Sequence, residues 1–204
     1  MTPTPGRFIT LEGIDGAGKS THAAFVAQHI RARGRNVVAT REPGGTALGE
    51  TLRLLLLNES MTRDTEALLM FAARREHLDL VIRPALERGD WVVCDRFTDA
   101  TYAYQGAGGG LAKDRIAVLE RWVNGGLLPD LTLVFDVPVD VARARLPKNR
   151  KDRFESENTA YFERVRAGYL ERAAAEPRRV RVVDGRRPLR EVEKEVEDIV
   201  STIC

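Results

Sequence analysis

The stretch from Gly13 to Ser20 reads Gly-Ile-Asp-Gly-Ala-Gly-Lys-Ser and limits the possible folds of this chain more than any other feature. It matches the pattern G-x-x-x-x-G-K-[S/T] and stands between a short apolar run, residues 8–11, and a segment with helical periodicity. Glycine lets backbone N–H groups approach an anion closely, and the start of the following helix adds positive potential. The pattern therefore predicts a phosphate-binding loop, although a tight strand-to-helix turn with a chance lysine is the alternative interpretation.

Individual positions of this loop have distinct expected roles. Lys19 is expected to reach the outer phosphates of a nucleotide, and Ser20 is expected to ligate magnesium. The reaction stays open at this point, because enzymes, regulatory switches and nucleic-acid motors share such a loop. We assign the nucleotide contacts to one continuous stretch: Gly13, Ile14, Asp15, Gly16, Ala17, Gly18, Lys19, Ser20 and Thr21.

Short apolar runs alternate with helical patterns along the whole chain. The runs are rich in β-branched residues and predict buried strands at residues 8–11, 37–39, 91–94, 131–135 and 180–183. Helices are predicted over 19–33, with Gly34 as C-cap, and over 189–203. This alternation is typical of an α/β fold with a mostly parallel sheet covered on both faces. Without a visible linker or repeat, residues 1–204 are expected to form a single domain.

The composition agrees with that expectation and weighs against several kinds of partner. The 204 residues are 43% hydrophobic and 30% charged, as in a soluble domain with a sizeable core. A net charge of +2 gives no support to non-specific nucleic-acid binding. Cys94 and Cys204 indicate neither a disulfide framework nor a metal site. With no signal peptide and no membrane-spanning run, we expect a cytoplasmic protein that binds neither membrane nor nucleic acid.

Two further patterns weigh against a GTPase and a nucleic-acid motor. Asn149–Asp152 imitates a guanine-binding N-K-x-D motif, but it follows a Pro-Lys pair instead of a buried strand. A motor would need a strand that ends in two acidic residues, whereas the run 91–94 is followed by Asp95 and Arg96. Asp95 can still serve magnesium through water, and Arg96 is a candidate anion clamp.

Arg41 and Arg96 are predicted to lie close together in space. Each follows a predicted strand, and the ligands of an open α/β sheet gather at the carboxyl ends of its strands. A planar guanidinium group suits a phosphate better than a point charge does. We therefore expect a second phosphate group beside the loop, with a structural salt bridge to a nearby acid as the alternative for either arginine.

Six motifs occur in order along nearly the whole chain: the loop with its preceding Glu12, REPGG at 41–45, FAARR at 71–75, DRF at 95–97, AYQG at 103–106 and DRFE at 152–155. With them the chain resembles the bacterial thymidylate kinases, a family of P-loop nucleoside monophosphate kinases. The resemblance implies a P-loop kinase fold, with a five-stranded parallel sheet flanked by helices and an arginine-rich lid at about 146–156. It also implies a homodimer that uses ATP and Mg²⁺ and transfers the γ-phosphoryl group to dTMP, giving dTDP and ADP for dTTP biosynthesis.

The resemblance assigns the phosphate and sugar contacts of dTMP residue by residue. Arg41 and Arg96 would hold the acceptor phosphate, with Pro43 in the stiff turn beside it. Asp15 would accept a hydrogen bond from the 3′-hydroxyl group. Tyr104 would crowd the sugar and disfavour a 2′-hydroxyl group.

The base contacts follow from the same resemblance. Phe71 would stack on thymine, and Arg75 would hydrogen-bond its O4 atom. Thr101 would approach the Watson–Crick edge, with Gln105 beside the pocket. From the apolar pattern alone, Phe71 is a better candidate for the core. Because adjacent helix residues cannot face the same way, the motif selects Arg75 and leaves Arg74 as a surface charge.

The catalytic cations are expected from both the loop and the lid. No basic side chain occurs at the variable loop positions, residues 14–17. Family members without a basic residue in the loop place the catalytic arginine in the lid. The resemblance therefore implies Arg153 as the first candidate for this arginine and Arg150 as the second. Lys19 and Arg96 complete the catalytic set. Without the resemblance, a solvated basic loop would be the better interpretation of the lid segment.

The candidate magnesium ligands are Ser20, Asp95 and Glu12, all of which offer the oxygen atoms that this ion prefers. A buried salt bridge from Glu12 to Arg96 is the alternative for that carboxyl group.

Other residues and other functions stay open. His22 and His29 fit a solvated helix edge, whereas His77 has no assigned role and stands where relatives often have glutamine. Gly109 stands where many relatives have an arginine. The alternative functions are a kinase for another nucleoside monophosphate and a non-catalytic nucleotide-binding switch.

Overall fold

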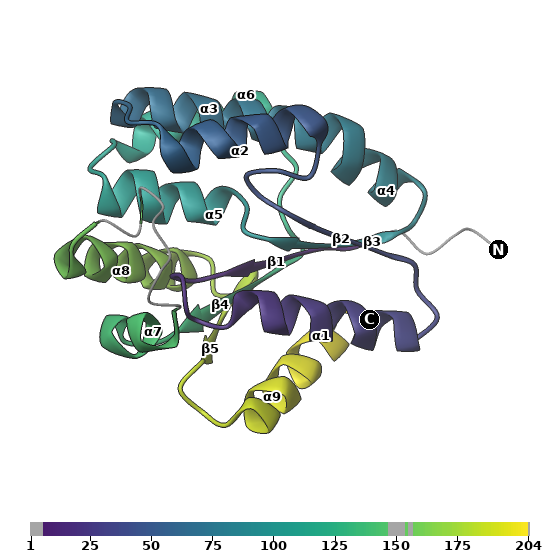
Figure 1. Ribbon diagram of the computed structural model, residues 1–204. Helices are drawn as coiled ribbons and strands as arrows, with labels where there is room; N and C mark the ends of the chain where they lie inside the picture. The colour runs from purple at the N-terminus through teal and green to yellow at the C-terminus, as the bar shows by residue number, and fades with distance from the viewer. Residues whose placement is uncertain (1–5, 147–153, 155–156, 204) are drawn as a thin grey trace.

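The sheet of this protein contains five strands in the order β2-β3-β1-β4-β5, and each neighbouring pair is parallel. The computed structural model describes residues 6–146, 154 and 157–203 (Figure 1). The α/β fold with a five-stranded parallel sheet is therefore confirmed. The strands are β1 (Phe8–Glu12), β2 (Val37–Arg41), β3 (Trp91–Asp95), β4 (Leu131–Asp136) and β5 (Val180–Asp184).

Every strand extends one or two residues beyond the C-terminal end of its predicted apolar run, and its last residue is charged. The apolar part is enclosed by helices, whereas the charged residue lies at the carboxyl edge, where parallel sheets bind ligands. β1 is buried at all of its positions because it is central, and the edge strand β2 is partly exposed. The terminal charged residues are Glu12, Arg41, Asp95, Asp136 and Asp184.

Helices cover both faces of the sheet. They are α1 (Lys19–Ala32), α2 (Ala47–Asn58), α3 (Arg63–His77), α4 (Arg83–Glu87), α5 (Thr98–Thr101), α6 (Lys113–Asn124), α7 (Val139–Arg145), α8 (Thr159–Ala175) and α9 (Leu189–Ser201), with π-helical turns η1 (Leu78–Ile82) and η2 (Tyr102–Gly108). Figure 1 shows α2, α3, α4 and α6 above the sheet and α1 and α9 below it.

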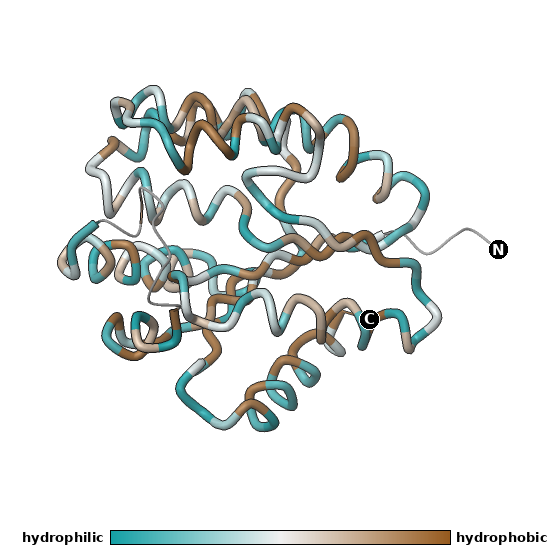
Figure 2. Tube along the Cα trace, in the orientation of Figure 1, coloured by the Kyte–Doolittle hydropathy of each residue, from teal (hydrophilic) through white to brown (hydrophobic). Residues whose placement is uncertain are grey.

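Successive strand residues point into two separate apolar clusters, as the pleat of a strand requires. Ile9 and Leu11 of β1 pack in the cluster that includes buried residues of α1 and α9. Phe8 of the same strand packs with buried residues of α3 and η1. The hydrophobic strands run through the middle of the molecule in Figure 2, which explains why their sequences are apolar on both faces.

Helix α1 has the predicted apolar face but one unexpected histidine. Val26 and Ile30 are buried, and Gly34 follows the helix with φ +76°. The expectation of a solvated edge is wrong for His22, which is buried and stacks on Phe135 with ring centroids 4.7 Å apart. None of the helices in the described ranges is long and apolar enough to cross a membrane.

Candidate active site

The glycine-rich loop joins β1 to α1 and needs glycine for steric reasons. Gly13, Gly16 and Gly18 all have positive φ angles, of +136°, +85° and +98°. A Cβ atom at Gly16 would lie 2.1 Å from the backbone oxygen of Ala142 in α7. A side chain at this position would displace either the loop or α7, so the glycine lets the loop pass close beside the helix.

The cationic and hydroxyl groups of the loop point toward the carboxyl edge of the sheet. The Lys19 ammonium donates to the carbonyl of Ile14 at 3.0 Å and lies 3.6 Å from the Asp15 carboxylate. Burial lowers the pKa of Lys19, and the nearby positive charge of Arg96 lowers it further. The Ser20 hydroxyl donates to the Asp95 carboxylate at 2.9 Å, so the structure brings these two expected magnesium ligands together.

Glu12 has a different environment from the one expected of a metal ligand. Its two carboxyl oxygens accept hydrogen bonds from the Phe97 backbone N–H at 2.7 Å and from the Tyr169 hydroxyl at 2.8 Å. Burial, with a further contribution from Asp99, raises the pKa of Glu12 to about 8, although the charge of Arg96 opposes this shift. Glu12 therefore positions the chain that follows β3, and it meets Arg96 through Tyr169 instead of in a direct ion pair.

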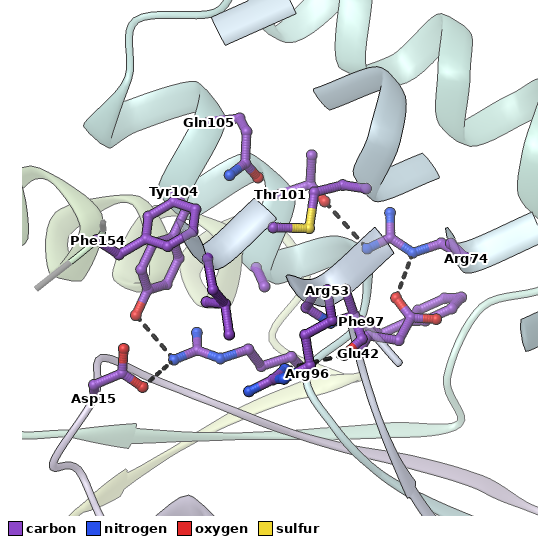
Figure 3. A pocket seen from close by; sticks show the side chains of 14 residues that line it. Asp15, Glu42, Arg53, Arg74, Arg96, Phe97, Thr101, Tyr104, Gln105 and Phe154 are labelled. Atoms are coloured by element: carbon purple, nitrogen blue, oxygen red, sulfur yellow. Dashed lines mark hydrogen bonds and ion pairs between the residues drawn. The ribbon is translucent and has the colours of Figure 1, made fainter. Parts of the chain in front are cut away.

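Arg96 is the residue on which the site converges. Its φ angle of +74° is in the left-handed region, which a non-glycine residue adopts at a cost, and such strain clusters at functional sites. Its guanidinium group donates to Asp15 at 2.7 Å, to the Tyr104 hydroxyl at 2.9 Å and to the Tyr169 hydroxyl at 3.1 Å. The same group lies 4.6 Å from the centroid of the Tyr104 ring. Asp15, Arg96 and Tyr104 are thus held as one unit (Figure 3).

A pocket lies beside this unit, between the loop, α2, α3, α5 and η2 (Figure 3). Tyr104 and Gln105 reach it from η2, one of the π-helical turns that often mark functional sites. Gln105 is oriented by its hydrogen bond to the buried Glu66, at 2.6 Å. The lining includes the expected residues Asp15, Pro43, Arg96, Thr101, Tyr104 and Gln105, and also Glu42, Arg53, Leu57, Met70, Arg74, Phe97, Ala100 and Phe154.

Arg74 contributes a buried cation to the pocket wall. It is 2% exposed and lies between the rings of Phe71 and Phe97, at 4.7 and 5.0 Å from their centroids. Its Nε donates to Glu42 at 2.7 Å, and its Nη2 donates to the Thr101 hydroxyl at 3.1 Å. Its Nη1 is buried and has no hydrogen-bond partner among the described residues. Arg74 is therefore a fixed cation in the wall of the pocket, held by Glu42, Thr101 and two aromatic rings.

Comparisons with known proteins identify the family of this chain. The family model described as thymidylate kinase matches residues 11–196. This chain belongs to the thymidylate kinase family. A thymidylate kinase of Bordetella petrii is 69% identical over 92% of this chain and 91% of the relative, and one of Cupriavidus metallidurans is 62% identical over 97% and 99%. The crystal structure of thymidylate kinase from Ehrlichia chaffeensis has a TM-score of 0.79 at 36% identity and covers 96% of this chain and 99% of that one.

Phe71 and Arg75 of α3, which were expected to contact the base, do not line the pocket. Phe71 is buried in the apolar cluster beneath the helix, and Arg75 is 53% exposed and pairs with Asp79 at 2.7 Å. Met70 and Arg74 line the pocket instead. They are four residues apart and so share one helix face, which means that the expected spacing is kept but begins one residue earlier.

Arg41 is also placed differently from the expectation. Its side chain is 54% exposed and its guanidinium group pairs with Glu50 at 2.8 Å, which is the salt bridge considered as the alternative. Arg53 of α2 lines the pocket in its stead and donates to the carbonyl of Pro43 at 3.0 Å. Its signal in the sequence is slight: it is the one arginine in the apolar stretch Leu-Arg-Leu-Leu-Leu-Leu.

The expected lid, about 146–156, is described only in part. Arg150 and Arg153 lie outside the described residues, as do all four residues of the N-K-x-D imitation. Phe154 is described: it lines the pocket, is buried and lies edge-on to Tyr104 with ring centroids 6.1 Å apart. Phe154 therefore contributes an aromatic wall to the pocket, a role that the sequence did not predict.

Proposed function

We propose that this protein transfers the γ-phosphoryl group of ATP to dTMP, giving dTDP and ADP for dTTP synthesis. The observation that carries the proposal is the unit of Asp15, Arg96 and Tyr104, which joins the phosphate-binding loop to a pocket lined by the buried cation of Arg74. A donor site and an acceptor site therefore share one wall. Family membership supports the same reaction.

The acceptor fits the pocket in one orientation. Arg96 and Arg53 supply positive charge at the end near the loop, where the phosphate of dTMP would lie. Asp15 and Tyr104 come next and would contact the sugar. Nη1 of Arg74 would donate to the O4 atom of thymine, which cytosine replaces with an amino group.

The apolar part of the pocket would enclose the ring of the base. Met70, Leu57 and Phe97 are among its apolar lining residues, and a thioether packs adaptably against an aromatic ring. Thr101 and Gln105 would face the Watson–Crick edge. The polar group at one end and the apolar wall around it together favour a pyrimidine with a 4-oxo group and a 5-methyl group.

The chain supplies charge and alignment to the transfer step, as phosphoryl-transfer enzymes do. The attacking oxygen of dTMP is already anionic near neutral pH, so no strong base is needed. Lys19 would hold the outer phosphates of ATP and Arg96 the acceptor phosphate, which lowers the repulsion between them. We place the remaining positive charge on Arg153, or on Arg150.

The residues at the carboxyl edge fit Mg²⁺. A hydroxyl group and a carboxylate 2.9 Å apart, from Ser20 and Asp95, are hard oxygen donors of the kind that hold this ion together with water and substrate phosphates. When bound, Mg²⁺ would neutralise charge on the phosphates of ATP. Glu12 is less suited, because both of its oxygens accept hydrogen bonds in the interior.

We further infer a cytoplasmic homodimer. Large apolar side chains are exposed on three neighbouring helices: Leu54 on α2, Leu68 on α3, and Val118 and Trp122 on α6. Figure 2 shows hydrophobic segments along α2 and α3 at the top of the molecule. Exposed apolar side chains gathered on neighbouring helices are typical of an interaction site, and two copies meeting through these helices would bury them symmetrically.

The reaction is tested with purified protein, ATP, Mg²⁺ and a panel of nucleoside monophosphates. We expect ADP and dTDP to form in equal amounts, with dTMP preferred over dUMP and far over dCMP. A different preferred monophosphate would assign the chain another acceptor. Binding of ATP without transfer to any monophosphate would instead support the nucleotide-binding switch.

A further inference from the structure

Glu42 is one of the two hydrogen-bond partners that hold Arg74, and Thr101 is the other. One carboxylate oxygen of Glu42, Oε2, accepts from Nε of Arg74 at 2.7 Å. A carboxylate held by one hydrogen bond can rotate, and an arginine that depends on it would rotate with it. A second contact on Glu42 therefore helps to keep the guanidinium group of Arg74 in one direction.

His77 provides that second contact. Its Nδ1 atom lies 3.1 Å from the other oxygen of Glu42, Oε1, and its Nε2 atom lies 2.7 Å from the hydroxyl of Thr40. His77 is fully buried, so water does not compete for either nitrogen. Because a carboxylate only accepts hydrogen bonds, Nδ1 must carry the proton that it donates to Glu42. In a neutral ring Nε2 then accepts from Thr40, and the charges of Arg74 and Glu42 balance each other.

The turn after β2 is shaped around this histidine. A Cβ atom at Gly45 would lie 2.5 Å from Nε2 of His77 and 2.7 Å from the Thr40 hydroxyl. The φ angle of Gly45, +79°, also favours glycine. The second glycine of the REPGG stretch therefore leaves room for the contact between Thr40 and His77, a task separate from binding phosphate.

We propose that His77 is a positioning residue for base selection, which acts through Glu42 to fix the direction of Arg74. The chain of contacts runs from Thr40 through His77 and Glu42 to Arg74, which lines the pocket. This inference rests on the proposed function insofar as the ligand of Arg74 is the base of dTMP. Outer contacts that orient a binding group commonly change affinity by about 10- to 100-fold when removed.

The test compares His77→Leu with His77→Asn. Leucine removes both ring nitrogens, so we expect the ratio of dTMP to dCMP affinity, measured by titration calorimetry, to decrease at least about tenfold. The KM for dTMP should increase by a similar factor while the KM for ATP changes less than about twofold. Asparagine keeps an N–H near the position of Nδ1 and should restore most of the ratio.

Two further variants separate this role from a merely structural one. Thr40→Val removes the outer hydrogen bond with little change in shape and should lower the affinity ratio in the same direction, which keeps the test available if His77→Leu does not fold. His29→Leu, on α1 and outside the pocket lining, should leave the ratio unchanged.

The outcomes distinguish the two claims. If folded His77→Leu binds dTMP and dCMP in the wild-type ratio, or if the affinity for both decreases equally, the positioning role is overturned. If the wild-type chain prefers dTMP but transfers no phosphoryl group, the proposed reaction is refuted, and the affinity ratios still decide the role of His77.

Discussion

Arg74 and Arg75 are adjacent arginines with opposite environments. Arg74 is buried between two aromatic rings, whereas Arg75 forms an exposed ion pair with Asp79 on the surface of α3. An exposed pair of this kind contributes at most about 1 kcal/mol, because water screens it. The planar fork of Arg74 uses separate N–H groups for Glu42, for Thr101 and for the pocket, so a lysine cannot replace it.

The first prediction therefore contrasts Arg74→Lys with Arg75→Lys. Arg74→Lys keeps the charge but loses the fork, and we expect the KM for dTMP to increase by about 10- to 100-fold. Arg75→Lys is the matched control and should stay within about twofold of the wild type in steady-state kinetics. A larger effect at Arg75 than at Arg74 would return the base contact to the register first expected from the sequence.

The second prediction concerns the buried carboxyl group of Glu12. Its pKa is raised from 4.5 to about 8 by burial, so between these pH values the folded chain keeps a proton that the unfolded chain has released. The stability of the wild type therefore decreases as pH rises through this window. Glu12→Gln removes the titration, and its stability relative to the wild type should rise by a few kcal/mol, on the order of 2–4, between pH 5 and pH 8.

Urea unfolding at several pH values measures this difference. Glu59→Gln, at an exposed position after α2, is the control and should show no comparable dependence on pH. A stability difference for Glu12→Gln that stays constant from pH 5 to pH 8 would show that the carboxyl group is ionised in the folded protein throughout that range.

At the scale of single residues, the sequence predicts which types of residue line the pocket better than it predicts their exact positions on α3. Asp15, Arg96, Tyr104 and Gln105 all lie where the pocket needs them. The α3 contacts differ because a spacing of four residues can begin at either of two adjacent positions, and an aromatic residue at position 71 favours the incorrect one. The structure distinguishes the two starting positions by burial. Successive residues of a helix are rotated by about 100°, so position 70 faces the pocket when position 71 faces the core.

At the scale of elements, the strands were predictable and the π-helical turns were not. A short run of β-branched residues directly predicts a strand of a parallel sheet. The charged residue that ends each strand is not predicted, because an apolar pattern does not include it. No sequence pattern predicts η2, because a π-helical turn differs from an α-helical turn by one extra residue and not by the types of residue it contains. The salt bridge of Arg41 was equally hidden, because Glu50 reaches it only once α2 has folded back along the sheet.

The third prediction tests the contact between the glycine-rich loop and α7. In Gly16→Ala, alanine must adopt a left-handed backbone conformation, and its Cβ atom overlaps the backbone oxygen of Ala142. The loop must therefore move, and we expect ATP affinity to decrease at least about tenfold. Gly34→Ala has a similar φ angle of +76° but no atom within 4 Å of the added Cβ. It should cost about 1 kcal/mol of stability and leave ATP affinity unchanged.

Calorimetric titration with ATP and thermal unfolding separate the two effects. Equal losses of ATP affinity in both variants would attribute the requirement for glycine to backbone conformation alone and would exclude a role for the close approach of α7.

At the scale of the whole molecule, the apolar surface on α2, α3 and α6 is the feature that a single copy leaves unexplained. Trp122 is 76% exposed, far more than a large aromatic side chain usually is in a folded domain. The helices that carry this surface also carry Arg53, Met70 and Arg74 of the pocket. Association through them would therefore support the acceptor site from behind.

The fourth prediction is that Trp122→Glu converts the proposed dimer to a monomer, because it places a charge among the exposed apolar side chains of α2, α3 and α6. Sedimentation velocity measures the change directly. Leu189→Glu is the control: Leu189 is also exposed, but it lies on α9 on the other side of the sheet (Figure 1). A wild-type chain that sediments as a monomer at micromolar concentration would refute the proposed homodimer.

The central place of β1 in the sheet has a consequence for how the protein is made. β1 precedes the other four strands of the sheet in the sequence, yet it pairs with β3 on one side and β4 on the other, and Thr10 bonds to Thr132, 122 positions later. Both edges of β1 are therefore open until β3 has been synthesised, and one edge stays open until β4 has been synthesised; open edges recruit other chains. Chains that end before Leu131 leave one edge of this apolar strand unpaired, and we expect them to aggregate more than the full chain does, which light scattering of a truncated chain would measure.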